Sequence, residues 1–516
     1  ASNNTGVGYN TLYANTTGAE NVGVGASALA GNTTGTRNVA MGHETLDANT
    51  TGSYNTAIGQ RALTTNTTAN DNTAVGYSAL YNTTGAQNTA VGRSALQENT
   101  TAGENTAVGA SAGTATTTGD VNTFIGSYAG TTNTTGSSNT ALGNAALRLA
   151  TTASYNTALG REAMKTNTTG HNNTAVGYQS MFSNTTGNGR NTAVGAGSLY
   201  TNTTGYQNTA VGYNSLRNNT TGYMNTAVGE TAGNGNTTGI ENAFFGFGAG
   251  AANTTASSNT FLGGYSGNVN TTGARNTGLG HNTLRSLTTG AGNIAIGFEA
   301  LKNNTTGAEQ VAIGYQALLT TTAGATKNVA IGKYAGYGLT TGYSNVFVGF
   351  QAGWDSGNGT TTGVGCVSLG AYSHPSSNTV YNEFVLGDNN IGNLRCNDTS
   401  ISGLSDQRDK ANISDLPSSS GLSLINALRP VTFNWDRREW YDDNTPDGSK
   451  IELNYDNTKA NSGLKQGFIA QEVKIAIANE KALVDSQMIT EENDDRIEFA
   501  PAQLITNLVK AIQELS

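Results

Sequence analysis

The chain has 516 residues, 68 of them glycine, and a formal net charge of -9 at pH 7. It has no basic stripe, so we expect no nucleic-acid binding. No run of about 18 apolar residues is present, so we expect no membrane insertion. The four histidines show no ligand spacing, and Cys366 and Cys396 are too few for a disulfide framework. We therefore predict buried or free thiols, no metal and no cofactor.

Residues 1–370 repeat one unit. The motif NTAVG opens and closes residues 208–229, and the glycine that ends it recurs 22 times from Gly8 to Gly370. Seventeen of the 21 steps are 17 residues long, and the others are 16, 18, 18 and 21. Self-similarity at a fixed period indicates a repeat architecture.

Each unit has two apolar-bearing segments and a polar corner. The residue before the glycine is always apolar, as in Val7 and Met41, and Leu12 or Leu29 illustrates the residue four positions after it. In other units that second position holds Met or Gly. The corner between them is NTTG or a close variant. So short a unit cannot bury a core alone, but stacked copies would join these segments into a continuous one.

The composition of the array favours strands over helices. Gly, Asn and Thr are poor helix formers, and short β-branched runs bounded by Gly and Asn are typical of strands. All five prolines lie after residue 374, as expected if the backbone N–H groups before them are used in ladders. We predict a mainly β fold, in which residues 1–370 form a parallel β-solenoid with one unit per coil. At a strand spacing of about 4.8 Å it would be on the order of 100 Å long.

Two other interpretations of the repeat carry less weight. A disordered polar tract would not keep its apolar positions in register over 370 residues. The Asn-Thr-Thr triplets match the N-glycosylation pattern, but we interpret them as the corner of the repeat. Stacked Asn and Thr at equivalent positions would form side-chain ladders along the rod.

The composition changes near residue 375, where proline appears and charge rises. Residues 371–404 read as a transition segment, with strands at VYNEFVLG and near NLRCN. SGLSLINALRPVTFNW predicts a helix that ends before Pro430, followed by a strand. KQGFIAQEVKIAIANE and IEFAPAQLITNLVKAIQELS each predict a strand entering a helix. The last helix carries an apolar stripe that would be a natural seam in a trimer, formed by Leu504, Leu508, Ile512 and Leu515.

Residues 405–516 resemble the intramolecular chaperone domain of phage tail spikes and fibres, the S74 peptidase family. The resemblance rests on four motifs in the family's order, which are SDQRDK with NI (405–413), LRP (428–430), GFIAQEV (467–473) and AIQEL (511–515). It implies a small α/β domain that trimerises the chain, helps the upstream β-structure fold and then cuts itself off.

The resemblance also implies the residues that carry out the cut. Ser405 would be the nucleophile, Lys410 the base, and Leu404–Ser405 the cleaved bond. A serine hydroxyl is a poor nucleophile until a base removes its proton, and lysine can act as that base only if its pKa is lowered. The alternative is that SDQRDK is a solvated charged loop without a catalytic role.

The leading hypothesis is a trimeric tail fibre of a phage, or a similar appendage, used for host attachment. Residue 1 is not Met, so we expect upstream sequence through which other tail or appendage proteins are contacted. A host glycan or protein would be the receptor. The expected location is the virion or an extracellular appendage, with the chaperone domain made in the host cytoplasm and released by the cut.

Three alternatives remain. The NTAVG units loosely resemble the heads of trimeric autotransporter adhesins, but residues 405–516 show no segment like their membrane anchor. A glycan-depolymerising tailspike would need two paired carboxylates, and the array has only 13 acidic residues. Rows of Asn and Thr on a flat solenoid would suit an ice or crystal surface.

Overall fold

The computed structural model describes residues 2–185, 189–354, 361–388, 416, 421–433, 465–478, 489–493, 496–499 and 504–516. The chain divides into two units, Ala1–Asn393 and Leu394–Ser516. Each unit has its own hydrophobic core. The first unit is a parallel β-solenoid of coils about one repeat long, as the sequence predicts.

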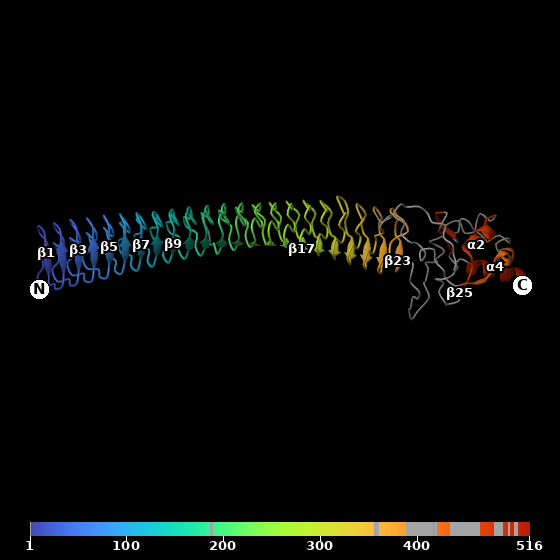
Figure 1. The fold of residues 1–516 in the computed structure, drawn as a ribbon, viewed down its shortest axis with the longest axis horizontal. Helices are drawn as coiled ribbons and strands as arrows, with labels where there is room; N and C mark the ends of the chain where they lie inside the picture. The colour runs from blue at the N-terminus through green and yellow to red at the C-terminus, as the bar shows by residue number, and fades with distance from the viewer. Residues whose placement is uncertain are drawn as a thin grey trace, which may run out of the picture. The chain divides into compact units, whose positions relative to one another are not determined.

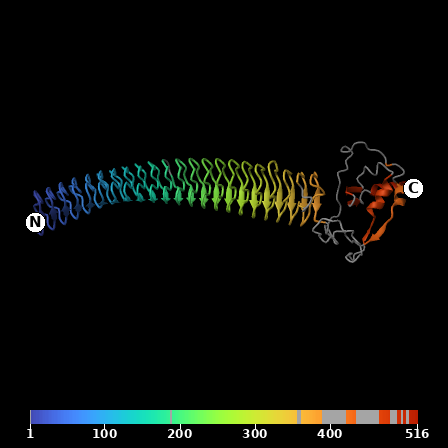
Figure 2. The same ribbon diagram turned by 45° about the horizontal axis from the view of Figure 1, so that its top comes forward.

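Each coil contributes one three-residue strand, which pairs in parallel with the strand of the next coil (Figure 1). The register advances by one repeat, so that Ala210 lies beside Ala227. Figures 1 and 2 show the strands stacked along one side of the coils. The strands are β1 Thr5–Val7, β2 Val22–Val24, β3 Val39–Met41, β4 Thr56–Ile58, β5 Thr73–Val75, β6 Thr89–Val91, β7 Thr106–Val108, β8 Thr123–Ile125, β9 Thr140–Leu142, β10 Thr157–Leu159, β11 Thr174–Val176, β12 Thr192–Val194, β13 Thr209–Val211, β14 Thr226–Val228, β15 Ala243–Phe245, β16 Thr260–Leu262, β17 Thr277–Leu279, β18 Ile294–Ile296, β19 Val311–Ile313, β20 Val329–Ile331, β21 Val346–Val348, β22 Val367–Leu369 and β23 Phe384–Leu386.

Side chains along each strand alternate between the inside and the outside of the coil. In β13, Ala210 is fully buried, whereas Thr209 and Val211 are only partly covered. Leu216, in the turn after the strand, completes the core of that coil. The apolar residue before the glycine therefore does not join the core, contrary to the sequence prediction. Strand side chains alternate with a period of two, and the central residue takes the inward position.

Phenylalanine and glycine compensate for each other in the core. The buried centre of four strands is Phe124, Phe244, Phe261 or Phe347. Around Phe124 the usual leucine position is Gly113 in the preceding coil and Gly130 in its own coil. A Cβ added at these glycines would lie 2.8 and 2.5 Å from the Phe124 ring, respectively. The ring thus fills space that leucine fills elsewhere, because a protein core tolerates little empty volume.

The glycine that ends the motif is required by the stacking of the coils. Gly212 has φ 131°, and a Cβ built there would lie 2.5 Å from the carbonyl oxygen of Gly229 in the next coil. Neither the backbone conformation nor the available space suits a side chain. The 17-residue recurrence of this glycine is therefore a direct consequence of coil-on-coil contact.

Two rows of buried asparagines hydrogen-bond the coils together. In the row before the strands, the Asn55 backbone N–H donates to Asn38 Oδ1 at 2.9 Å, and the Asn38 amide donates to the Gly52 carbonyl at 2.8 Å. In the row at the corners, the Asn49 amide donates to Asn32 Oδ1 at 2.8 Å and to the Gly52 carbonyl at 2.9 Å. These side chains are fully buried. The Asn-Thr-Thr triplet is therefore the corner of the repeat, as interpreted from the sequence.

Threonines form a third row at the same corners. Thr33 Oγ1 donates to the Thr50 carbonyl at 3.0 Å, and Thr50 Oγ1 donates to the Thr67 carbonyl at 3.0 Å. The predicted Asn and Thr ladders are both confirmed. The asparagine ladders satisfy polar groups that would otherwise be costly to bury, whereas the threonine bonds lie closer to solvent.

The stack continues beyond the predicted end of the array at residue 370. β23 pairs in parallel with β22, so part of the predicted transition segment is one more coil. The strand predicted in VYNEFVLG is therefore confirmed, but it belongs to the solenoid. The motif is hidden there because Phe384 replaces the usual Thr and Val385 the usual Ala. The strand predicted near NLRCN lies outside the described residues.

The second unit combines short helices with antiparallel strands. β24 pairs with β25, and β26 pairs with β27. Leu424, Val473, Ile477 and Leu504 form its core. The predicted helix before Pro430 and the two predicted strand-to-helix segments are confirmed. Its elements are α1 Leu422–Ala427, β24 Val431–Phe433, β25 Lys465–Gly467, α2 Ala470–Ile477, β26 Ile489–Asn493, β27 Arg496–Phe499 and α4 Leu504–Leu515.

Candidate functional site

The predicted cutting residues lie outside the described part of the chain. These are Ser405, Lys410 and the Leu404–Ser405 bond. The Ser–Lys dyad therefore stays a prediction. The structure does describe three of the four motifs that carry the family resemblance, namely LRP, GFIAQEV and AIQEL.

Two of these motifs are joined by an ion pair. Arg429, just after α1, donates through Nε to Glu472 Oε2 at 3.0 Å and through Nη2 to Glu472 Oε1. The two residues lie 43 positions apart in the sequence. Hydrogen bonding from Arg429 holds the pKa of the Glu472 carboxyl below its usual range. Both side chains are exposed, at 66% and 40%, so the pair contributes little stability while it connects the segment after α1 to α2.

The third motif, AIQEL, caps the N-terminus of α1. Gly421, the N-cap of α1, offers no capping side chain. Instead, the Leu422 backbone N–H donates to Glu514 Oε2 of α4 at 2.7 Å. A Cβ at Gly421 would lie 2.4 Å from the same oxygen, so glycine leaves room for the carboxylate. A carboxylate at a helix N-terminus satisfies free N–H groups, so the AIQEL motif supplies the missing cap.

The terminal helix uses a different face from the one predicted to form its apolar stripe. Leu504, Asn507 and Ala511 are buried within the second unit. By contrast, Ile512 and Leu515 of the predicted stripe are 66% and 70% exposed. Among the described residues, Leu504 is the member of that stripe that belongs to the core, and the other three members are exposed.

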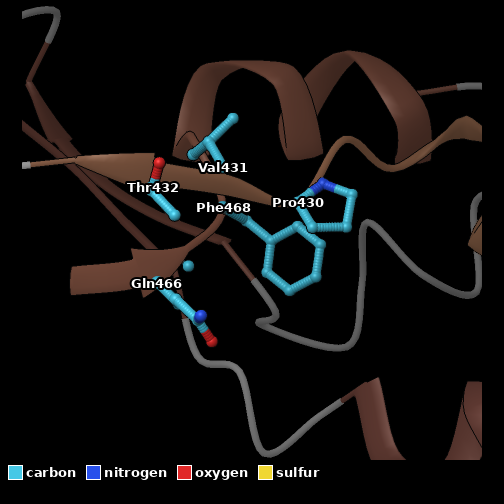
Figure 3. Close-up of a pocket in the computed structure, with 6 residues that line it drawn as sticks. Pro430, Val431, Thr432, Gln466 and Phe468 are labelled. Atoms are coloured by element: carbon cyan, nitrogen blue, oxygen red, sulfur yellow. The ribbon is translucent and has the colours of Figure 1, made fainter. Parts of the chain in front are cut away.

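A shallow groove of about 590 Å³ lies beside the strand pair β24–β25 (Figure 3). Thr432 and Gln466 are its polar lining residues, and none of the six is an acid or a base that could activate the Thr432 hydroxyl. The lining residues are Pro430, Val431, Thr432, Gln466, Gly467 and Phe468.

The described residues also bear on metal binding, membrane insertion and the cysteines. No cluster of three His, Cys, Asp or Glu side chains within the described ranges could hold a metal ion. In the same residues, no helix has both the length and the apolar character to cross a membrane. Cys366 is a buried free thiol, in line with the predicted buried or free thiols, and burial raises its pKa. Cys396 lies outside the described residues.

These motifs agree with a comparison against known families. Residues 405–481 match the Peptidase_S74 family, described as chaperone of endosialidase. The match begins at Ser405, includes Lys410, and contains α1, β24, β25 and α2. No curated protein matches the chain. A chaperone-of-endosialidase segment behind a long β-solenoid is the organisation of a tail-fibre or tailspike type of protein.

The sequence predicts the motifs of this unit but not which residues of these motifs contact one another. The Arg429–Glu472 pair joins LRP to GFIAQEV, and Glu514 joins AIQEL to the start of α1. The opposite charges of Arg429 and Glu472 were the available signal. Their separation along the chain gave no reason to pair them before the fold was known.

Proposed function

We propose that this chain is a trimeric fibre protein of a phage tail or comparable appendage, whose C-terminal domain assembles the rod and then cuts itself off. The observation that carries the proposal is the Peptidase_S74 match placed directly after a rod of 23 stacked strands. The rod would provide length, and attachment to a host surface would be its purpose. Other tail proteins would be its assembly partners.

The physical need for a chaperone follows from the uniformity of the rod. Coils that differ by few residues can pair out of register at nearly equal free energy. Parallel β-structure also forms slowly, because its contacts join segments distant in sequence. A domain that brings three chains together at one end would set a common register before the coils stack.

The cut would follow Ser–Lys chemistry. Lys410, in its neutral form, takes the proton of the Ser405 hydroxyl, and the hydroxyl oxygen attacks the Leu404 carbonyl carbon. The peptide C–N bond breaks, the Ser405 nitrogen takes the proton back from Lys410 and becomes an amine, and an ester joins Leu404 to Ser405 Oγ. Water then hydrolyses the ester and leaves a carboxylate at Leu404. Such a cut acts once and in cis, so no pocket for other substrates is required.

The test is the intact mass of the expressed chain compared with Ser405→Ala. The proposal expects two fragments that meet at Leu404–Ser405 from the parent chain and one uncut chain from the variant. Sedimentation should give three copies for both. One full-length species in both chains would reject the cut, and a monomer would reject the fibre.

A second candidate, depolymerisation of a glycan, is favoured by one observation. Burial and then the neighbouring Glu44 raise the pKa of Asp47, and a raised pKa is one of the properties that a general acid needs, beside a second carboxylate at a suitable distance. Glu44 is itself paired with Arg61 at 2.8 Å. This candidate predicts that host polysaccharide releases reducing ends and that Asp47→Asn stops the release. No release from the parent chain would reject it.

A further inference from the structure

The outer surface of the strands has an unusual composition. We call the first and third residues of β1–β23 the strand face. The third residue is Val, Ile, Leu, Met or Phe in every strand, and none of the residues of β1–β23 is charged. The first residue is Thr in most central coils and Val, Ile or Phe in β18–β23.

Many side chains of the strand face are open to solvent in the single chain. Met41, Leu142 and Leu262 are 43%, 46% and 45% exposed, although each lies between neighbours in the adjacent coils. The third residues alone expose solvent-accessible apolar surface on the order of 1,000 Å². This is more than the roughly 300–600 Å² of the largest apolar patch on a typical monomer. It also matches the about 800 Å² that each partner contributes to a standard interface.

The charges of the rod lie elsewhere. Ion pairs such as Arg37–Glu20 and Lys302–Glu299 are formed by residues of the turns and corners. A surface designed to face water carries such groups, and an exposed strand row normally carries them too. The strands themselves therefore form an uncharged strip along the described rod, and the charged residues lie in the turns and corners that flank it.

We propose that the strand face is the surface along which the rods of three copies of this chain pack, with corresponding coils at the same level. The inference rests on the proposed trimer and adds which side of the rod is inside it. A partner must offer an uncharged apolar row that is equally long and repeats once per coil. A second copy of this chain meets both requirements, since its own row has the same 17-residue step.

Other occupants fit the strand face less well. A glycan or an ice lattice would be held by a regular row of hydroxyls. The threonine row is interrupted at Val22, Val39 and Ala243 and ends at Thr277. The apolar row runs unbroken from Val7 to Leu386. The continuous feature is thus the apolar one, which favours packing between rods.

Site-directed cross-linking of the full chain tests this placement. Val211→Cys puts a thiol on the strand face, and Gln207→Cys puts one in the preceding corner of the repeat, where the side chain is also accessible. Residue 211 of three chains should meet near a common axis, and a short bifunctional maleimide should bridge them. Denaturing gels should show cross-linked chains for Val211→Cys and only the background of the parent chain for Gln207→Cys.

The outcomes separate this inference from the proposed function. A trimer by sedimentation that cross-links through Gln207→Cys and not through Val211→Cys would overturn the strand face and keep the fibre. A trimer in which neither variant cross-links would do the same. A monomer by sedimentation would overturn both the packing of the strand face and the proposed fibre. This holds whether or not the monomer shows thermal hysteresis, the sign of ice binding by a free strand face.

A charge placed on the strand face gives a second measurement. Val211→Lys should lower the melting temperature of the trimer and increase its dissociation on dilution. Asn218→Lys, at an exposed turn position of the same coil, should change neither. Equal behaviour of the two variants would overturn the proposal.

Discussion

The two units of this protein are built on opposite principles. Each coil of the rod contacts copies of itself, and the same glycine, asparagine and leucine positions are used again and again. The second unit uses every contact once, as in the Arg429–Glu472 pair and the Glu514 cap on α1. Repeated contacts add up to a stable stack, but they do not define which coil pairs with which. Contacts that occur once define a single arrangement, but each adds little stability. The comparison explains why one chain would need both.

The largest effect on assembly is expected from removal of residues 405–516. The remaining rod keeps all its coil contacts but loses the unit that would set its register. We expect aggregated or polydisperse material in place of a single trimer, measured by soluble yield and sedimentation. Ser405→Ala, which keeps the domain attached, is the control and should remain a uniform trimer. A truncated chain that forms the same trimer would contradict the chaperone role.

Within the rod, the glycines that contact each other between coils should tolerate substitution least. Gly324→Ala introduces a Cβ at φ 91° with no atom within 4 Å, so backbone strain of about 1–3 kcal/mol is expected. Gly212→Ala adds a clash with the Gly229 carbonyl to a similar strain. Urea unfolding should show a clearly larger loss for Gly212→Ala. Equal losses would mean that the coils can move apart to accept a side chain.

Because Phe and Leu fill the same space in different coils, loss of stability from one substitution should be partly restored by a second. Phe124→Ala should leave a cavity and cost about 3–5 kcal/mol of unfolding free energy. Gly130→Leu should restore part of that loss when combined with Phe124→Ala, although it should destabilise the chain when Phe124 is present. Thermal unfolding of the two single variants and the double variant measures the coupling. Additive effects would show that the two positions do not share one space.

Neighbouring asparagines allow a matched test of the ladders. Asn219 donates to Asn202 Oδ1 at 2.8 Å and accepts from the Asn236 amide at 2.8 Å. Asn219→Ala leaves buried polar groups unpaired, so a loss of about 1–3 kcal/mol is expected. Asn218→Ala, at the exposed position next to it, should change the unfolding free energy little. A similar loss for both would argue against the ladder as a source of stability.

The smallest expected effect concerns the ion pair of the second unit. The pKa of Glu472 is lowered in the folded state from an ordinary value of 4.5. The pair therefore stabilises the unit above that value, and the contribution disappears as pH falls through the lowered pKa. Glu472→Gln should weaken the unit at neutral pH and make no difference in strong acid. A variant effect that is independent of pH would contradict this assignment.

Most of the rod could be predicted because its information is local and repeated. The step of the glycine gives the coil length, and the absence of proline before residue 375 agrees with backbone groups used in ladders. β23 was missed as a coil because Phe384 and Val385 replace the residues by which the motif is recognised. In the second unit, secondary structure followed from local pattern, but the partner of Glu472 did not, since 43 residues separate it from Arg429.

The sequence by itself determined that this protein repeats, how long each coil is, and that a chaperone-like segment follows the rod. Only the tertiary structure decided the direction of each side chain. In a three-residue strand, turning the central residue inward turns both of its neighbours outward. That choice buries Ala210 and leaves Val211 on the outer face. An apolar row that looked like core in the sequence thereby becomes a surface.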